Sequence, residues 1–361
     1  MREDQRSSIG IALDSGGAKG GAHLGVLQVL EDNDIYLDII TGSSAGAFAG
    51  AVYAAKKLGD LLDIIKDMNL RESLGYYLDP VFPTSGLLGG KRVRTFLEDL
   101  FGDLKIEDLA IRFVAVATDL LTGETVVIDK GPVVDAIMAS ISMPGIFKPV
   151  IHMDRLLTDG GVSDPLPVDV LKDYSPKLSI ACNLHPSLPS RFNKKQRERI
   201  LKTEKSVLKQ DIDFASVISE RLIKFMDSQQ ILEGIRPKVV SIMRKINSTG
   251  EKIKEAEFVN AIQEQIRSRK DKLKAMLDFT KEENKDMLNI FEIMAISTNI
   301  QQYQKNKLML SIIKPDVVIS PEVDYIGTLD FTSTMHALEI GRKEALKAIP
   351  SIKRLIEEKG I

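Results

Sequence analysis

The chain has 361 residues, of which 43% are hydrophobic and 28% charged, as in ordinary globular domains. Its formal net charge of −2 argues against a general nucleic-acid-binding surface, and a single cysteine, Cys182, excludes an internal disulfide. No apolar run of the sequence approaches the about 20 residues that cross a bilayer. We therefore expect a cytoplasmic protein with no nucleic-acid partner, and attachment from the side to the inner membrane face stays open.

Short apolar runs alternate with helical patterns in the first half of the chain. This alternation predicts an α/β fold, a central and mostly parallel sheet flanked by helices. The expected strands are residues 9–13, 37–41, 113–117, 125–128, 177–181 and 316–320. The expected helices are residues 22–31, 45–57 and 133–140; the last ends before Pro144, because the residue before a proline leaves the helical region.

A different composition separates the last two expected strands. Residues 191–286 contain almost no glycine or proline, have apolar residues at helical spacing, and carry 23 basic against 16 acidic side chains, a net charge of +7. We predict a main domain in two parts, residues 1–190 and 287–361, interrupted by this helical insertion. The insertion is either a solvated helical hairpin or bundle, or a lid, membrane or oligomer module whose basic residues meet anionic headgroups.

A Gly-Ser-Ser-Ala-Gly pentad at residues 42–46 follows the strand expected at 37–41 and opens an alanine-rich helix. Such a sharp turn from strand to helix leaves the central hydroxyl, that of Ser44, exposed at the sheet edge, and the glycines permit the close backbone approach. Pentads of small residues also occur by chance. The pattern therefore makes Ser44 a candidate nucleophile. The residues around Ser44 have to distinguish a catalytic serine from a chance match.

The glycine-rich segment 14–21 lies between the first expected strand and the first expected helix. Its main-chain N–H groups would form an anion-binding concavity at a helix N-terminus. Lys19 is neither preceded by glycine nor followed by Ser or Thr, as a P-loop requires, and Ser15 stands where a dinucleotide fingerprint requires its first glycine. An oxyanion hole for acyl transfer fits better, and a plain tight turn is the structural alternative.

A serine nucleophile needs a base. In the order Ser, Asp, His, that base would be His185 or His336, and each is also explained as a structural or surface histidine. Asp159 is the stronger candidate, since it follows a strand-like end and is followed by Gly160 and Gly161. In a water-poor site the pKa of a carboxyl group rises, which makes a two-residue Ser-Asp arrangement workable.

Together these segments make the sequence similar to the patatin-like phospholipases, lipid acyl hydrolases with a Ser-Asp dyad, and to their bacterial members related to neuropathy-target-esterase catalytic domains. The likeness covers residues 9–188 and roughly 288–348. It rests on five segments in the correct order, at residues 13–27, 42–50, 139–147, 158–161 and 315–331.

The resemblance implies roles for particular residues. Ser44 is the expected nucleophile and Asp159 the expected base. The remaining site residues are expected to form the oxyanion hole (Gly16, Gly17 and Ala18) and to support the elbow and loops (Gly42, Gly46, Lys19, Gly160 and Gly161). Asp119 matches a recurrent segment and is interpreted as structural. Ser15 departs from the family's run of three glycines, and would strain the loop if that position needed a positive φ.

The expected substrate is a phospholipid or another fatty-acyl ester, cleaved without metal or cofactor. Three other acyl-transfer enzymes would use the same dyad: a carboxylesterase, a thioesterase or an acyltransferase. A weakly active membrane-binding or scaffold protein is the alternative of a different class. The sequence also leaves open whether the protein forms a homo-oligomer.

Overall fold

The computed structural model describes residues 9–67, 90–188, 198, 201 and 290–361. The chain divides into two compact units, one of Met1–Arg191 with Met294–Ile361 and one of Phe192–Ile293. Almost all described residues belong to the first unit. The predicted insertion, residues 191–286, lies almost entirely outside the described residues, so its helical character and its membrane or oligomer role stay predictions.

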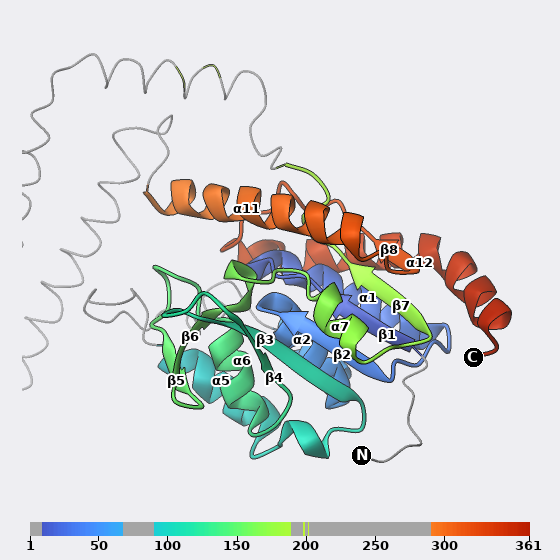
Figure 1. Ribbon diagram of the computed structural model, residues 1–361, viewed down its shortest axis with the longest axis horizontal. Helices are drawn as coiled ribbons and strands as arrows, with labels where there is room; N and C mark the ends of the chain where they lie inside the picture. Colours follow the sequence, from blue (N-terminus) through green and yellow to red (C-terminus); the bar gives the residue numbers. More distant parts are fainter. Residues whose placement is uncertain (1–8, 68–89, 189–197, 199–200, 202–289) are drawn as a thin grey trace, which may run out of the picture. The chain divides into compact units, whose positions relative to one another are not determined.

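An eight-stranded sheet forms the centre of the first unit (Figure 1). Its strands are β1 (Ile9–Leu13), β2 (Ile39–Ser43), β3 (Arg112–Asp119), β4 (Thr125–Ile128), β5 (Val150–His152), β6 (Arg155–Asp159), β7 (Leu178–Cys182) and β8 (Val317–Ile319). The order is β5-β6-β3-β2-β1-β7-β8, and β4 pairs with β3 beside this path. The pairings from β3 through β2, β1 and β7 to β8 are parallel, and those of β3 with β4 and β6 and of β5 with β6 are antiparallel.

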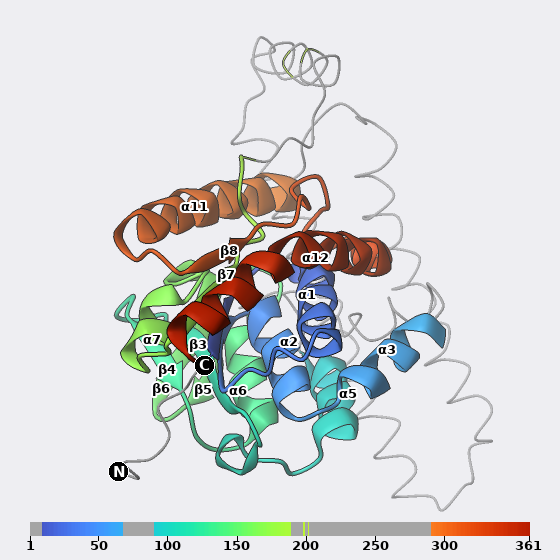
Figure 2. The same cartoon turned by 90° about the vertical axis from the view of Figure 1, so that its right-hand side faces the viewer.

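Helices cover both faces of this sheet. They are α1 (Gly21–Asp32), α2 (Ala45–Ala54), α3 (Leu58–Asp67), α5 (Lys91–Phe101), α6 (Val133–Ser140), α7 (Val168–Asp173), α11 (Ile290–Ile312) and α12 (Thr334–Lys359). Short 3-10 turns are η1 (Gly17–Gly20), η2 (Ile106–Asp108), η3 (Gly160–Val162) and η4 (Phe331–Ser333). Figure 2 shows α7 on one side of the sheet and α1, α2 and α5 on the other.

Side-chain alternation along the strands explains the two layers of helices. In β1, Ile11 and Leu13 pack into a core shared with α1, α2, α3, α5, α6 and α12. Ala12 points the other way, into a smaller core with Leu171 of α7 and with Met309 of α11. The fold is therefore the predicted three-layer α/β arrangement with a mostly parallel sheet, and this prediction is confirmed.

Helices α1 and α12 touch through glycines, although their sequences lie about 300 residues apart. A Cβ at Gly21 or Gly25 of α1 would collide with the carbonyl oxygen of Thr334 or Leu338 of α12. A Cβ at Gly341 of α12 would in turn collide with a carbonyl oxygen of α1. The absence of side chains at these positions is what lets the two backbones approach so closely.

Gly25→Ala should therefore lower the free energy of unfolding by about 1–3 kcal/mol, because the added methyl group forces the two helices apart. Gly59→Ala is the matched control. Gly59 lies in α3, where a Cβ would have no neighbour within 4 Å, and alanine there should raise stability by about 0.5–1 kcal/mol through helix propensity. Urea unfolding followed by circular dichroism measures the free energy of unfolding of both variants. Equal values for the two variants would contradict the close packing of α1 and α12.

Candidate active site

Ser44 sits at the turn between β2, which ends at Ser43, and α2, which begins at Ala45. Its backbone angles are φ 52° and ψ −115°, an unfavourable conformation for a residue with a side chain. The turn closes tightly because a Cβ at Gly42 or Gly46 would collide with the main chain of Gly46 or Leu13. These contacts produce a sharp turn from strand to helix at Ser44, and the role of Ser44 as a nucleophile stays a prediction.

Asp159 is the last residue of β6 and lies opposite Ala117 of the antiparallel strand β3. The Ser44 hydroxyl donates a hydrogen bond of 2.6 Å to its Oδ2, and the Gly161 N–H donates one of 2.7 Å to its Oδ1. Burial raises the pKa of Asp159 from 3.8 to about 6, although both hydrogen bonds act to lower it. The structure thus brings together a serine and an aspartate 115 residues apart, with the carboxylate oriented by a main-chain donor.

The serine residues at the end of α6 hold these two residues in place. Ser140 Oγ accepts a 2.8 Å hydrogen bond from the Ser44 N–H and donates one of 2.6 Å to the Val116 carbonyl. The Ser142 carbonyl accepts a 3.0 Å hydrogen bond from the Asp159 N–H. Sequence reasoning noted this segment but assigned no role to Ser140. The available signal was a hydroxyl in the last turn of a helix whose other residues, apart from Asp135, are apolar.

The glycine-rich loop follows β1. A Cβ at Gly17, whose φ is +57°, would collide with the Thr328 carbonyl, so only glycine fits there. The same carbonyl accepts a 2.9 Å hydrogen bond from the Ala18 N–H. Within the described part of the chain, the N–H groups of Gly16 and Gly17 have no main-chain partner. The Ala18 N–H is already engaged, so of the three residues predicted to form an oxyanion hole only Gly16 and Gly17 stay candidates as donors.

The same loop adjoins the segment that follows Asp159. A Cβ at Gly161 would lie 3.0 Å from Ser15 Cβ and 2.5 Å from Gln302 Nε2, and a Cβ at Gly160 would collide with the Val116 carbonyl. Ser15 does not adopt a positive φ, and its N–H donates a 2.8 Å hydrogen bond to the Pro165 carbonyl. The departure from glycine at this position therefore causes no backbone strain.

Lys19 lies beneath the loop with only 1% of its surface exposed. Its Nζ donates a 3.2 Å hydrogen bond to Oδ1 of Asn299 in α11, and burial lowers its pKa from 10.5 to about 8. This geometry agrees with a residue that supports the loop.

The two histidines considered as bases lie elsewhere. His185 contacts Asp14 and Asn299, and His336 is hydrogen-bonded to the exposed Tyr325 hydroxyl at 2.6 Å. In the part of the chain that the structure describes, no imidazole is hydrogen-bonded to the Ser44 hydroxyl. Asp119 accepts a 2.9 Å hydrogen bond from the Leu121 N–H and lies 3.6 Å from Arg155, contacts that suit a structural residue.

Among the described side chains, no group of three or more His, Cys, Asp or Glu could hold a metal ion. None of the described helices is long and apolar enough to cross a membrane.

The first unit is a three-layer α/β fold in which a serine lies at the turn from a parallel strand into a helix. A carboxylate, instead of a histidine, lies beside that serine. These two features together define a distinct class of protein. Residues 11–172 match the model of the patatin-like phospholipase family. The chain therefore contains a patatin-like phospholipase domain.

Relatives support this assignment. An uncharacterised NTE family protein of Mycobacterium tuberculosis is 39% identical over 187 residues, which are 52% of each chain. A patatin-like phospholipase domain-containing protein of Caenorhabditis elegans is 33% identical over 49% of this chain and 14% of its own. The match thus spans about half the length of the first relative and less of the second. The solved structure of VipD from Legionella pneumophila aligns over 55% of this chain and 53% of its own, with 14% identity and a TM-score of 0.35, too low to establish a common fold.

Proposed function

We propose that this protein is a serine lipid acyl hydrolase of the phospholipase A or lysophospholipase type. The single observation that carries the proposal is the 2.6 Å hydrogen bond from the Ser44 hydroxyl to a buried Asp159 carboxylate. A serine hydroxyl at a strained elbow, with a carboxylate as its only hydrogen-bonding side chain among the described residues, suits nucleophilic catalysis more than a structural role.

The proposed reaction has two halves. Ser44 Oγ attacks the ester carbonyl while its proton passes to Asp159 Oδ2, and the carbonyl oxygen becomes an oxyanion facing the N–H groups of Gly16 and Gly17. Collapse of this intermediate expels the alcohol, which takes the proton from Asp159. A water molecule then gives its proton to Asp159 and attacks the acyl-serine, which releases the fatty acid and restores the Ser44 hydroxyl.

Two exposed apolar side chains on segments that adjoin the site support a fatty-acyl substrate. Val162, three residues after Asp159, is 51% exposed, and Leu329, next to the carbonyl of Thr328 that contacts the glycine-rich loop, is 47% exposed. Large accessible apolar side chains near an active site suit an alkyl chain better than a polar acyl group. They favour a lipid ester over the small esters that the same dyad would also cleave.

The test is release of fatty acid from phosphatidylcholine in mixed micelles, measured from pH 4.5 to 9 beside a short-chain p-nitrophenyl ester. The base is the ionised Asp159, so activity should be low when its carboxyl is protonated, rise through about pH 6 and level off above it. The Ser44→Ala variant should be inactive at every pH. A rate that does not change across pH 6 would contradict Asp159 as the base, and turnover of the short ester alone would contradict a lipid substrate.

A further inference from the structure

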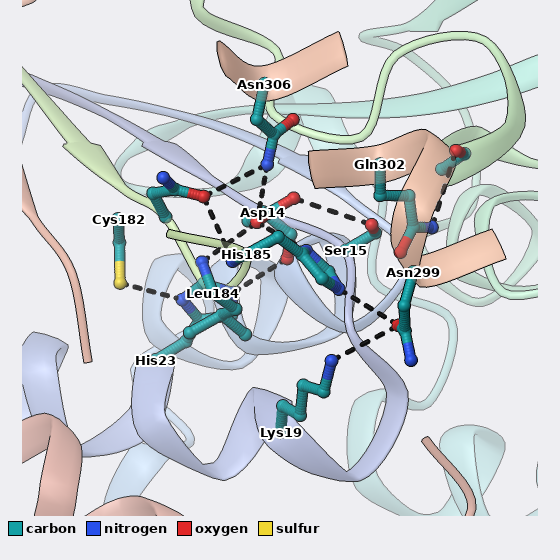
Figure 3. Close-up of polar contacts among 12 residues, drawn as sticks. Asp14, Ser15, Lys19, His23, Cys182, Leu184, His185, Asn299, Gln302 and Asn306 are labelled. Carbon is teal, nitrogen blue, oxygen red and sulfur yellow. Dashed lines mark hydrogen bonds and ion pairs between the residues drawn. The ribbon is translucent and has the colours of Figure 1, made fainter. Parts of the chain in front are cut away.

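Three amides of α11 form a buried polar face against the glycine-rich loop (Figure 3). Asn299, Gln302 and Asn306 follow one another at helical spacing and are all buried. Gln302 Nε2 donates a 3.4 Å hydrogen bond to the Gly161 carbonyl, and Asn306 Nδ2 donates one of 2.8 Å to Asp14 Oδ2. This helix, far away in sequence, therefore touches both the loop and the segment that follows Asp159.

Lys19 fixes the orientation of the Asn299 amide. An ammonium group has only donors, so the atom that faces it must be the amide oxygen; the reversed amide would place donor against donor. The structure accordingly has Asn299 Oδ1 3.2 Å from Lys19 Nζ. The pKa of Lys19 is about 8, so at neutral pH the lysine is mostly charged and offers only donors.

His185 lies between two acceptors. Its Nδ1 is 2.9 Å from Asp14 Oδ2 and its Nε2 is 3.2 Å from the same Asn299 Oδ1. Asp14 Oδ2 also receives the Leu184 N–H at 2.9 Å, together with the Asn306 amide, as an ionised carboxylate does. Neither oxygen can donate, so both ring nitrogens of His185 have to carry a proton for both hydrogen bonds to form.

The neighbouring His23 differs from His185, because its ring lies between an acceptor and a donor. Its Nε2 is 2.7 Å from the Asp14 carbonyl oxygen, so this nitrogen donates. Its Nδ1 is 3.2 Å from Cys182 Sγ, and burial keeps that sulfur a thiol by raising its pKa, so Nδ1 can accept the S–H. Burial also lowers the pKa of His23 to about 4. His23 is thus a neutral ring in the same cluster, and it serves as an internal reference for His185.

We propose that Asn299 and Asp14 hold His185 as an imidazolium, and that His185 and Lys19 place two positive charges beneath the oxyanion loop to support the negative charge of the transition state. This inference rests on the proposed function. The groups that face the two cations are the Asp14 carboxylate from the end of β1, neutral His23 from α1, the thiol of Cys182 from β7, and the partly exposed Asp324, which acts on Lys19. Asn299, His185 and Lys19 are positioning residues, since none of them touches Ser44.

The physical reason lies in the low dielectric of the interior. A charge that is fixed and buried next to the loop acts on the oxyanion with little screening and without reorganisation during the reaction. Removing the oxygen of Asn299 leaves Lys19 without its acceptor and lets His185 lose the proton on Nε2. Both changes weaken the field at the loop while the Ser44–Asp159 pair stays intact.

Nitrogen NMR of the full chain labelled with 15N-histidine tests the charge state. At pH 7.5 we expect both ring nitrogens of His185 to carry protons and only Nε2 of His23 to do so, with His185→Gln assigning the signals. Asn299→Leu should give a neutral His185 ring, and Asn299→Asp, which keeps an oxygen acceptor, should leave the ring doubly protonated. A neutral His185 ring in the wild type or in Asn299→Asp would overturn the proposal, even if the leucine variant does not fold.

The rate at which a fluorophosphonate labels Ser44 tests the role of the charge. Asn299→Leu should lower this rate about 10- to 100-fold and should lower kcat for ester hydrolysis more than it changes KM. Gln304→Leu, an exposed amide on the same helix, should leave both unchanged. Equal rates in the two variants would overturn the electrostatic role. A wild-type protein that does not label at all would instead point to failure of the proposed function.

Discussion

Ser44→Ala should abolish ester hydrolysis, with a loss of at least about 10⁴-fold in kcat/KM. In the proposed mechanism this hydroxyl forms the acyl intermediate, and a methyl group in its place offers no nucleophile. Folding should survive, because Ser44 donates its side-chain hydrogen bond to Asp159 alone, while its N–H remains bonded to Ser140. Initial rates and thermal unfolding of the purified variant measure the two expectations.

The adjacent serine supplies the control. Ser43 is also buried, but its hydroxyl has no hydrogen-bond partner among the described residues, so Ser43→Ala should keep most of the activity. If the Ser44 variant retained wild-type turnover, or if both variants lost activity equally, the assignment of the nucleophile would be wrong.

Asp159→Asn should lower kcat about 100- to 10,000-fold, the usual contribution of general acid-base catalysis. The amide keeps the shape of the carboxyl group and can still accept the Gly161 N–H, but it cannot take the serine proton. The remaining activity should lose its dependence on pH near 6. A pH profile that keeps this step in the asparagine variant would show that another group titrates there.

The same Asp159→Asn substitution should change stability in the opposite direction to activity. The folded-state pKa of Asp159 lies above its ordinary value of 3.8 because burial disfavours the charged form. The contribution of this group to stability is therefore complete below pH 3.8 and is lost as the pH rises through about 6. The asparagine side chain stays neutral, so the variant should unfold at an equal or higher temperature than the wild type at pH 8.

Asp119 supplies the control for activity. It is a second buried aspartate, to which we assign a structural role, so Asp119→Asn should retain most of the activity.

The local features of the site could be predicted from the sequence. The sharp turn at Ser44 depends on a strand, a five-residue motif and a helix that follow one another directly in the chain. β1 and β4 have the predicted bounds, and the other predicted strands differ by one or two residues at their ends. β5 was not predicted, because three partly exposed residues at Val150–His152 show neither an apolar run nor a clear alternation.

The contacts that depend on distant segments could not be predicted. Nothing local shows that the Ala18 N–H bonds to the carbonyl of Thr328, 310 residues further on, and is therefore unavailable to an oxyanion. Asn299, Gln302 and Asn306 resemble the polar face of a surface helix, and only the fold buries them against the loop. His185 was a candidate base by chain order, and its contacts with Asp14 and Asn299 instead make it part of the support beneath the loop.

The most direct test of the central claim is to find where a covalent label attaches. The wild-type protein is treated with a fluorophosphonate, digested, and its modified peptide is sequenced by mass spectrometry. We predict one phosphonyl group, on Ser44, with a labelling rate that falls sharply in Asp159→Asn. A label on any other residue, or full hydrolytic activity in protein whose Ser44 is completely modified, would contradict a mechanism built on this serine and its buried aspartate.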